Sequence, residues 1–210
     1  MFKIIKKEPL NPSMTRMVIE APFVARKAMP GQFIILRVNE TGERIPLTIA
    51  DYDREAGTVT IIYQKVGKST LLLDEQEAGG YLMDFIGPLG KASELEGYKK
   101  AAVIGGGAGC AIAYPQAKAL HAMGTKVDMI AGFRDKDLII LENEMREASD
   151  RLIVMTDDGS NGNKGFVTAA LQKNIDEGAD YDLVIAIGPI PMMKAIQNWQ
   201  TAYNMENQLS

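Results

Sequence analysis

The chain has 210 residues, of which 46% are apolar and 24% are charged, a composition that supports one or two hydrophobic cores and excludes intrinsic disorder. Lys and Arg number 23 against 27 Asp and Glu, and the resulting net charge of −4 argues against nucleic acid or an anionic membrane as a partner. A single cysteine, Cys110, excludes an internal disulfide and a Cys-ligated iron–sulfur cluster within these residues, and with a single histidine, His121, we predict no metal site.

In the first half of the chain, short β-rich runs alternate with turn residues. Pairs such as Asn11-Pro12, Thr41-Gly42 and Ala56-Gly57 predict turns. Strands are predicted between the turns at residues 3–6, 14–20, 33–38, 58–64 and 81–86, and one helix at residues 69–78. Short strands at this spacing indicate an antiparallel β-barrel or sandwich.

After residue 97 the pattern changes to strands that alternate with helices. Nearly continuous apolar runs predict buried parallel strands at residues 101–104, 127–131, 152–155 and 183–187. Helices are predicted between and after them at residues 110–123, 138–148, 166–174 and 192–203. This alternation predicts a doubly wound parallel sheet. The boundary is expected within residues 87–100, where GPLG at residues 87–90 predicts a turn.

The segment AAVIGGGAG, residues 101–109, leads from a predicted strand through a glycine-rich turn into a predicted helix. Such a turn lets a pyrophosphate approach the backbone, and the helix N-terminus offers free N–H groups. The dinucleotide fingerprint fits in part, because Cys110 stands at the third glycine and the second strand ends at Arg134 without an acidic residue. We expect a nucleotide here, but not a standard Rossmann dehydrogenase; a tight turn without a ligand is the alternative.

Two segments of the first half carry residue types that bind phosphate. GKST at residues 67–70 lacks the first glycine of an NTPase phosphate loop, whose position Ile62 occupies, yet it offers a cation and hydroxyls. RIPLTI at residues 44–49 combines a cation, a fixed backbone and a hydroxyl, which suit a ring and its phosphate. An ordinary edge strand with a surface arginine has the same pattern.

Two polar loops follow the third and fourth predicted parallel strands. They are TDDGS at residues 156–160 and GPIPM at residues 188–192. Ligands of open α/β sheets bind at the carboxyl ends of the strands. Turn chemistry alone explains either loop, but three such strand-end loops favour a binding site.

No segment predicts a targeting signal or a membrane span. The N-terminus, MFKIIKKE, is charged where a signal peptide is apolar. The longest uncharged run, residues 101–117, is shorter than a membrane-spanning helix and contains several glycines and Pro115. We therefore expect a cytoplasmic protein.

The ordered set of motifs, over nearly the whole chain, resembles the ferredoxin–NADP reductase superfamily. Within it, the sequence is similar to the electron-transfer subunit of dihydroorotate dehydrogenase and to the flavin subunits of sulfide dehydrogenase and of NADH-dependent ferredoxin:NADP oxidoreductase. The resemblance implies an FAD-binding, six-stranded-type antiparallel β-barrel at residues 1–96 and an NAD(P)-binding, doubly wound α/β domain at residues 97–210. Those relatives continue into a Cys-rich segment with a [2Fe–2S] cluster, which we do not expect within this chain.

The resemblance also implies roles for particular residues, all in cofactor binding. It implies no catalytic side chain. Those placed at the FAD are Arg44, Pro46, Leu47, Thr48, Ile62, Tyr63, Gln64, Gly67, Lys68, Ser69 and Thr70. Those placed at the nicotinamide dinucleotide are Gly106, Gly107, Ala108 and Gly109. Those placed at the border of the cleft where nicotinamide meets flavin are Asp158, Gly159, Gly188 and Pro189. Arg134 suits the 2′-phosphate of NADP, but Asp135 and Asp137 would repel it, which favours NAD.

The implied activity is hydride transfer from NAD(P)H to FAD in an electron-transfer subunit. The electrons would pass to a larger catalytic dehydrogenase-type subunit or an iron–sulfur centre outside these 210 residues. One alternative is a stand-alone NAD(P)H:acceptor reductase that reduces quinones or free flavin. Another is a nucleotide-binding module without turnover.

Overall fold

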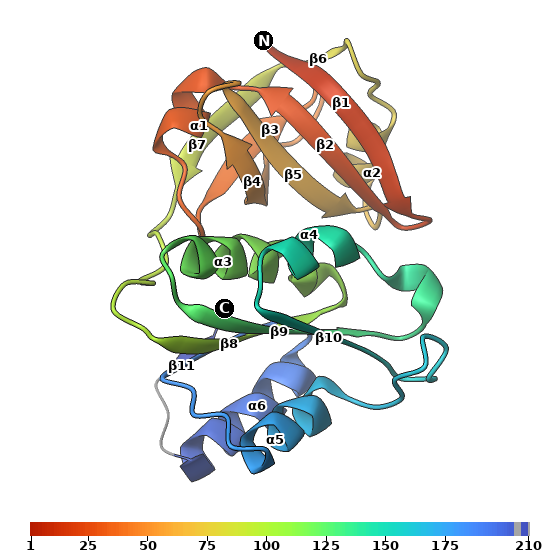
Figure 1. Cartoon of the computed structure of the whole chain (residues 1–210). Helices are drawn as coiled ribbons and strands as arrows, with labels where there is room; N and C mark the ends of the chain where they lie inside the picture. The colour runs from red at the N-terminus through yellow and green to blue at the C-terminus, as the bar shows by residue number, and fades with distance from the viewer. Residues whose placement is uncertain (204–206, 210) are drawn as a thin grey trace. The chain divides into compact units, whose positions relative to one another are not determined.

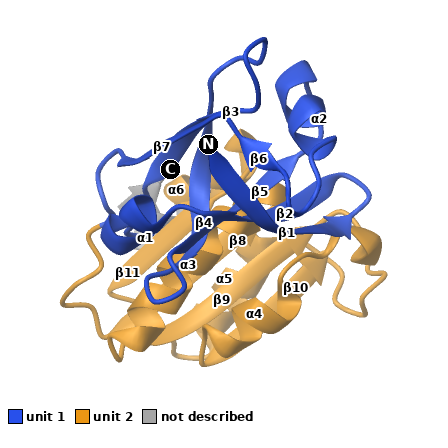
Figure 2. Ribbon diagram, turned by 90° about the horizontal axis from the view of Figure 1, so that it is seen from above, with its two compact units in different colours: residues 1–93 blue, residues 94–210 orange. Residues whose placement is uncertain are grey.

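The computed structural model describes the backbone of residues 1–203 and 207–209 and the side chains of residues 1–198. The chain forms two compact units, Met1–Ser93 and Glu94–Ser210 (Figure 2). Among the helices of the described residues, none is both long and apolar enough to cross a membrane.

The first unit is an antiparallel seven-stranded sheet that curls into a nearly closed barrel (Figure 1). The predicted barrel is therefore confirmed. Two short helices, α1 (Pro22–Lys27) and α2 (Lys68–Asp74), accompany it. In sheet order the strands are β6 (Tyr81–Leu82), β1 (Phe2–Asn11), β2 (Met14–Glu20), β5 (Thr58–Gln64), β4 (Ile45–Asp53), β3 (Phe33–Arg37) and β7 (Asp84–Leu89).

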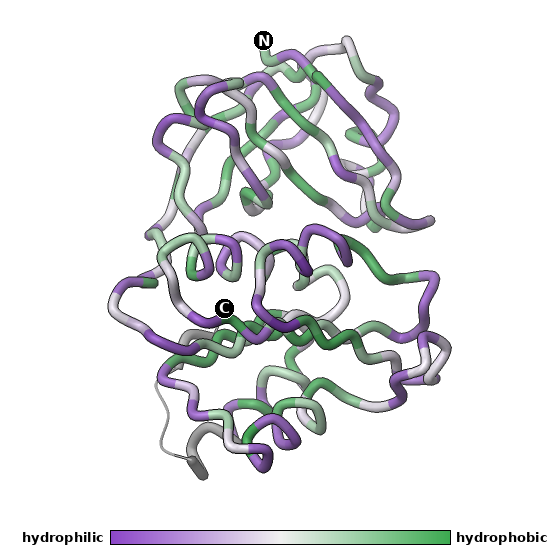
Figure 3. Tube along the Cα trace, in the orientation of Figure 1, coloured by the Kyte–Doolittle hydropathy of each residue, from purple (hydrophilic) through white to green (hydrophobic). Residues whose placement is uncertain are grey.

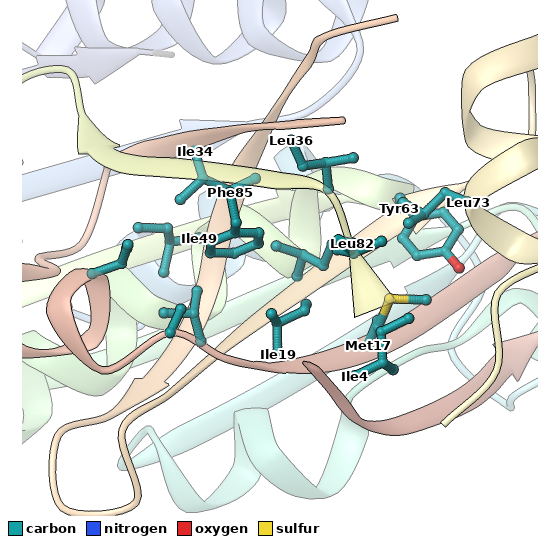
Figure 4. Close-up of a cluster of buried hydrophobic side chains, with 14 of the residues drawn as sticks. Ile4, Met17, Ile19, Ile34, Leu36, Ile49, Tyr63, Leu73, Leu82 and Phe85 are labelled. Atoms are coloured by element: carbon teal, nitrogen blue, oxygen red, sulfur yellow. The ribbon is translucent and has the colours of Figure 1, made fainter. Parts of the chain in front are cut away.

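The barrel core is built by strands that bury alternate residues. In β5, Val59, Ile61 and Tyr63 point inward, and the residues between them lie on the outer face. Figure 4 shows how side chains from several strands and from α2 meet in this core, among them Ile4, Met17, Ile19, Ile34, Leu36, Ile49, Leu73, Leu82 and Phe85. Because register fixes the face on which each residue lies, burial of one face also fixes which side chains remain outside.

The second unit is a parallel sheet in the order β10 (Arg151–Thr156), β9 (Lys126–Phe133), β8 (Lys100–Gly106), β11 (Leu183–Ile187) and β12 (Asn207–Leu209). Helices α3 (Cys110–Ala122) and α4 (Glu142–Glu147) cover one face, and α5 (Val167–Asp176) and α6 (Ile190–Tyr203) cover the other (Figure 1). The doubly wound sheet is confirmed. Its central strands are apolar along most of their length (Figure 3), because both faces are covered.

Two predictions near the end of the barrel are wrong. The single strand expected at residues 81–86 is two strands, since β6 pairs with β1 whereas β7 pairs with β3 at the other end of the sheet. The turn expected at residues 87–90 is strand up to Leu89. Pro88 fits there because β7 is a terminal strand that pairs on one side, where a missing N–H is tolerated.

Two predicted helices are shorter than expected. The helix expected at residues 69–78 ends at Asp74, whose carbonyl oxygen accepts a hydrogen bond from Lys7 Nζ on β1. The helix expected at residues 138–148 begins only at Glu142, because Leu141 adopts a left-handed φ of 56°. The preceding residues form a short 3₁₀ turn, η2 (Lys136–Leu138), that the Asp135 side chain caps. Helix α1 and strands β4 and β12 were not among the elements predicted from the sequence.

A buried polar network lies at the amino-terminal edge of the parallel sheet. The Tyr181 hydroxyl donates to Asp128 Oδ2 at 2.5 Å and accepts from Asn174 Nδ2 at 3.0 Å. Lys100 Nζ lies 4.0 Å from the same carboxylate oxygen. Burial and the neighbouring Asp128 raise the pKa of Tyr181, so its proton stays on the hydroxyl and is donated to the carboxylate.

We predict that Tyr181→Phe destabilises the protein by about 2 kcal/mol, since it leaves a buried carboxylate without its hydroxyl donor. Urea denaturation measures the change. Tyr81→Phe is the matched control, because the Tyr81 side chain is half-exposed, and its stability should equal that of the wild type. Equal stability of the two variants would refute the prediction.

Candidate functional site

The glycine turn after β8 packs its backbone directly against the turn after β11. A Cβ on Gly109 would lie 2.3 Å from the carbonyl oxygen of Ile187, and one on Gly188 would lie 3.1 Å from Gly106 Cα. A Cβ on Gly105 would lie 2.7 Å from Cys110 Sγ. A side chain at residue 105 or 109 would overlap these atoms and one at residue 188 would crowd the Gly106 backbone, so the glycines are needed for the packing itself.

The other side of this turn is open. Gly107 has a φ of +54°, and a Cβ there would meet no atom within 4 Å. It begins the 3₁₀ turn η1 (Gly107–Gly109), which leads into the 13-residue helix α3, and Ala108 is exposed. The turn thus presents uncovered backbone at the start of a long helix, the arrangement that binds phosphate groups.

Cys110 is buried completely. Burial raises the pKa of its thiol to about 12, so the side chain is a neutral thiol at physiological pH. Its Sγ fills the space beside Gly105. Cys110 therefore replaces the third glycine of the fingerprint as a small packing residue.

The loops after β9 and β10 run side by side. Asp157 N donates to the carbonyl of Phe133 at 3.0 Å, and Asp158 N donates to that of Arg134 at 3.3 Å. The backbone N–H and the hydroxyl of Ser160 lower the pKa of Asp158, which is therefore an anion at neutral pH. The structure thus places Arg134, Asp158 and Gly159 together at the carboxyl edge of the sheet.

The loop after β10 is held by residues that the sequence did not single out. The buried Thr156 hydroxyl donates to Asn161 Oδ1 at 2.7 Å. Nδ2 of Asn161 and Nδ2 of Asn163 both donate to the carbonyl of Val154, at 2.9 and 3.2 Å. These bonds close the loop onto its own strand and fix the positions of Asp158 and Gly159.

In the first unit, the predicted flavin residues come from two neighbouring strands and the turn that follows them. Arg44 directly precedes β4, which pairs with β5 through Ile49 and Ile61. A Ser69–Glu43 hydrogen bond of 3.0 Å links the start of β4 to the start of α2. The predicted residues that lie at the start of β4, at the end of β5 and in the turn before α2 are Arg44, Pro46, Leu47, Thr48, Ile62, Tyr63, Gln64, Gly67, Lys68, Ser69 and Thr70.

The turn before α2 is held by its own threonine. The Thr70 hydroxyl accepts hydrogen bonds from the N–H groups of Val66 and Gly67, both at 3.1 Å, and donates to the Gly67 carbonyl at 3.0 Å. The hydroxyl thus makes all three of its hydrogen bonds within the turn. A Cβ on Gly67 would meet no atom within 4 Å, and Lys68 is exposed, so the outer side of the turn is open.

Tyr63 points into the barrel instead of outward. Its hydroxyl donates to Asp74 Oδ1 at 3.1 Å, and the Thr15 hydroxyl donates to the same oxygen at 2.7 Å. Lys65 Nζ lies 3.6 Å from the other carboxylate oxygen. Asp74 therefore ties α2 to β2 and β5, and Tyr63 has only its backbone to offer a ligand on the outer face.

Among the residues described, no group of three or more His, Cys, Asp or Glu side chains is arranged to hold a metal ion. His121 lies exposed at the end of α3, with its Nε2 3.8 Å from Asp150 Oδ2.

Comparison with known proteins agrees with this fold. The oxidoreductase NAD-binding domain family matches residues 103–198. A Thermotoga maritima homologue of the dihydroorotate dehydrogenase B (NAD(+)) electron transfer subunit is 43% identical over 192 residues, which cover 91% of this chain and 67% of that protein. The Geobacillus electron transfer subunit is 32% identical over 200 residues, covering 92% and 76%. A solved structure described as NADH-dependent reduced ferredoxin-NADP oxidoreductase has a TM-score of 0.90 at 38% identity and covers 98% of this chain and 74% of that chain.

The fold and the relatives define an NAD(P)H-dependent oxidoreductase, or a subunit of one, that uses a flavin. The chain belongs to the ferredoxin–NADP reductase-like superfamily, in which it is similar to the electron transfer subunits of dihydroorotate dehydrogenase B. The resemblance seen in the sequence is confirmed.

We predict that Gly109→Ala destabilises the protein by roughly 3 kcal/mol, because its Cβ would overlap the Ile187 carbonyl. Gly107→Ala is the matched control: it costs about 1 kcal/mol, from the left-handed backbone alone. Thermal denaturation compares the two. Similar losses would show that the close backbone contact is not needed.

We predict a pH dependence from Asp74. Burial acts to raise its pKa, but hydrogen bonds from Thr15 and Tyr63 and the charges of Lys7 and Lys65 outweigh it and lower the pKa below 3.8. The stabilisation is therefore present above about pH 4 and is lost as pH falls through the folded-state pKa. Asp74→Asn should cost about 1–2 kcal/mol at pH 7 and reduce the loss of stability between pH 5 and pH 3.

Urea denaturation across this pH range is the measurement. Glu75→Gln is the control, since Glu75 follows Asp74 directly and is exposed. An unchanged pH profile in Asp74→Asn would contradict the role of this carboxylate.

Proposed function

We propose that the first unit binds FAD and the second binds NAD(P)H, and that the protein passes electrons from NAD(P)H through FAD to an acceptor. The glycine turn at residues 105–109 carries this proposal, because it combines enforced close packing on one side with open backbone on the other. The relatives support it, since the similar proteins are named electron transfer subunits or an NADH-dependent oxidoreductase.

The side chains and the open backbone of the predicted flavin residues in the first unit suit a flavin nucleotide. Arg44 is exposed and cationic, and Ser69 and Thr48 carry hydroxyl groups. Above Gly67, the space that a Cβ would take is empty, so a phosphate can approach the backbone there. Ile62 and Gln64 lie on the outer face of β5 and offer an apolar surface and an amide group. These groups would orient the flavin and neutralise its phosphates.

The second unit fits the nicotinamide nucleotide in the same way. Backbone N–H groups of Gly107, Ala108 and Gly109 would bind its pyrophosphate at the start of α3. Gly188 and Pro189 would border the nicotinamide end, because they pack on the same turn. Bound FAD supplies the redox chemistry, as the acceptor of a hydride and the donor of electrons. The protein binds and orients, and no side chain transfers a proton.

We propose NADH as the preferred donor. Arg134 is exposed at the end of β9, where it suits a 2′-phosphate. Asp157 and Asp158 belong to the loop that runs alongside, and their negative charges would repel the 2′-phosphate of NADPH. NADH carries no 2′-phosphate and avoids this repulsion.

We propose that the electrons leave to a partner subunit of the dehydrogenase type, as the names of the relatives suggest. A stand-alone reductase of quinones or free flavin is the alternative. Co-purification of a larger subunit supports the first, and rapid turnover with dyes by the isolated chain supports the second.

We expect the purified protein to take up FAD, and NADH to bleach the bound flavin anaerobically faster than NADPH. Gly107→Ala should raise the Kd for NADH by about tenfold, because its methyl group would enter the phosphate space, and should leave the Kd for FAD unchanged. Stopped-flow absorbance and calorimetry measure both. A protein that takes up no FAD would overturn the proposal.

A further inference from the structure

The arginine proposed to face the flavin phosphate is held by a carboxylate from another strand. Arg44 Nη2 donates to Asp84 Oδ2 at 2.9 Å. Arg37 Nε donates to the same oxygen at 2.8 Å. Asp84 begins β7 and lies directly opposite Arg37 of β3 in the sheet register. One carboxylate oxygen therefore joins two guanidinium groups.

The register explains why these three side chains meet. Leu36 of β3 pairs with Ile45 of β4, so the next position places Arg37 beside Arg44. Like charges opposite each other on neighbouring strands destabilise a sheet. Asp84, on the other side of Arg37, offsets that repulsion.

Burial differs within the cluster. The side chains of Arg37 and Asp84 are 21% and 22% exposed, whereas that of Arg44 is 56% exposed. Arg37 and Asp84 therefore form the fixed base, and Arg44 is the member that reaches solvent. Within the part of the chain that the structure describes, Arg44 donates through Nη2 alone, to Asp84, so its remaining N–H groups are available to an anion.

The charge of the cluster also favours an anion. Two guanidinium groups stand against one carboxylate, which leaves the cluster of Arg37, Arg44 and Asp84 with a net positive charge. Without Arg37, Asp84 would neutralise Arg44 and cancel its attraction for phosphate.

We propose that Asp84 is a positioning residue that aims Arg44 at a flavin phosphate, and that Arg37 keeps the pair cationic. The inference rests on the proposed FAD site. A guanidinium already fixed in place loses less side-chain entropy when it binds than a free one does. Asp84 therefore acts on FAD affinity through Arg44 alone.

The test is a double-mutant cycle on FAD binding to the full-length apoprotein, with riboflavin as the phosphate-free probe. Arg44→Ala should weaken FAD binding by about 10- to 100-fold, and Asp84→Asn by about tenfold, with riboflavin affinity changed less than about twofold. In the Arg44→Ala background, Asp84→Asn should have no further effect.

Glu8→Gln is the matched control, because Glu8 also bridges two cations, Lys6 and Arg16, within the same barrel but among none of the proposed site residues. Its FAD affinity should equal that of the wild type. If Asp84→Asn does not fold, Arg37→Gln tests the cluster instead. It should weaken FAD binding and flatten its dependence on salt, because the net charge is lost.

The outcomes separate the two ideas. If Arg44→Ala leaves FAD affinity unchanged, the proposed FAD contact fails. If Arg44→Ala weakens FAD binding but Asp84→Asn has the same effect with and without Arg44, only the positioning role fails. Tighter FAD binding in Asp84→Asn would likewise overturn it, since Asp84 would then compete with the phosphate.

Discussion

The contact between two backbones at residues 109 and 187 is the constraint on which the second unit depends. The Ile187 carbonyl lies where any side chain of residue 109 would begin. This contact lets the end of β11 pack directly on the start of α3, so two strand ends and a helix N-terminus meet at one point. The same packing turns Gly107 toward open space. Tight packing on one side of the turn and exposed backbone on the other are therefore two results of one contact.

Much of the fold was predictable because the hydrophobic pattern along each strand depends on whether one or both of its faces are buried. Four apolar runs in the second half indicated a sheet covered on both faces, and β8 to β11 are that sheet. The prediction failed where the boundary of an element depends on contacts with residues far away in the sequence. Residues 81–86 form one β-rich run, but Leu82 pairs with β1 and Asp84 with β3. Likewise, α2 ends where Lys7, more than sixty residues away in sequence, binds its last carbonyl.

The sequence indicated where the glycine turns of the candidate site lie, but not which residues hold its charged side chains. Glycine turns are local, so residues 105–109 and 67–70 were found from their own sequence. The contacts that hold the charged side chains are not local. Arg44 depends on Asp84, and Ser69 on Glu43, across 40 and 26 positions. Tyr63 was assigned to the flavin by resemblance, and only the register of β5 shows that its ring lies inside the barrel.

The Thr70 hydroxyl, which closes the turn before α2 with three hydrogen bonds, has a consequence for the energetics of ligand uptake. A turn that already holds its shape gives up little freedom when a phosphate arrives. Binding there should then be accompanied by a small entropy penalty and little rearrangement of the chain. At the proposed FAD site, the order of this turn is thus set when the chain folds and not when a ligand binds.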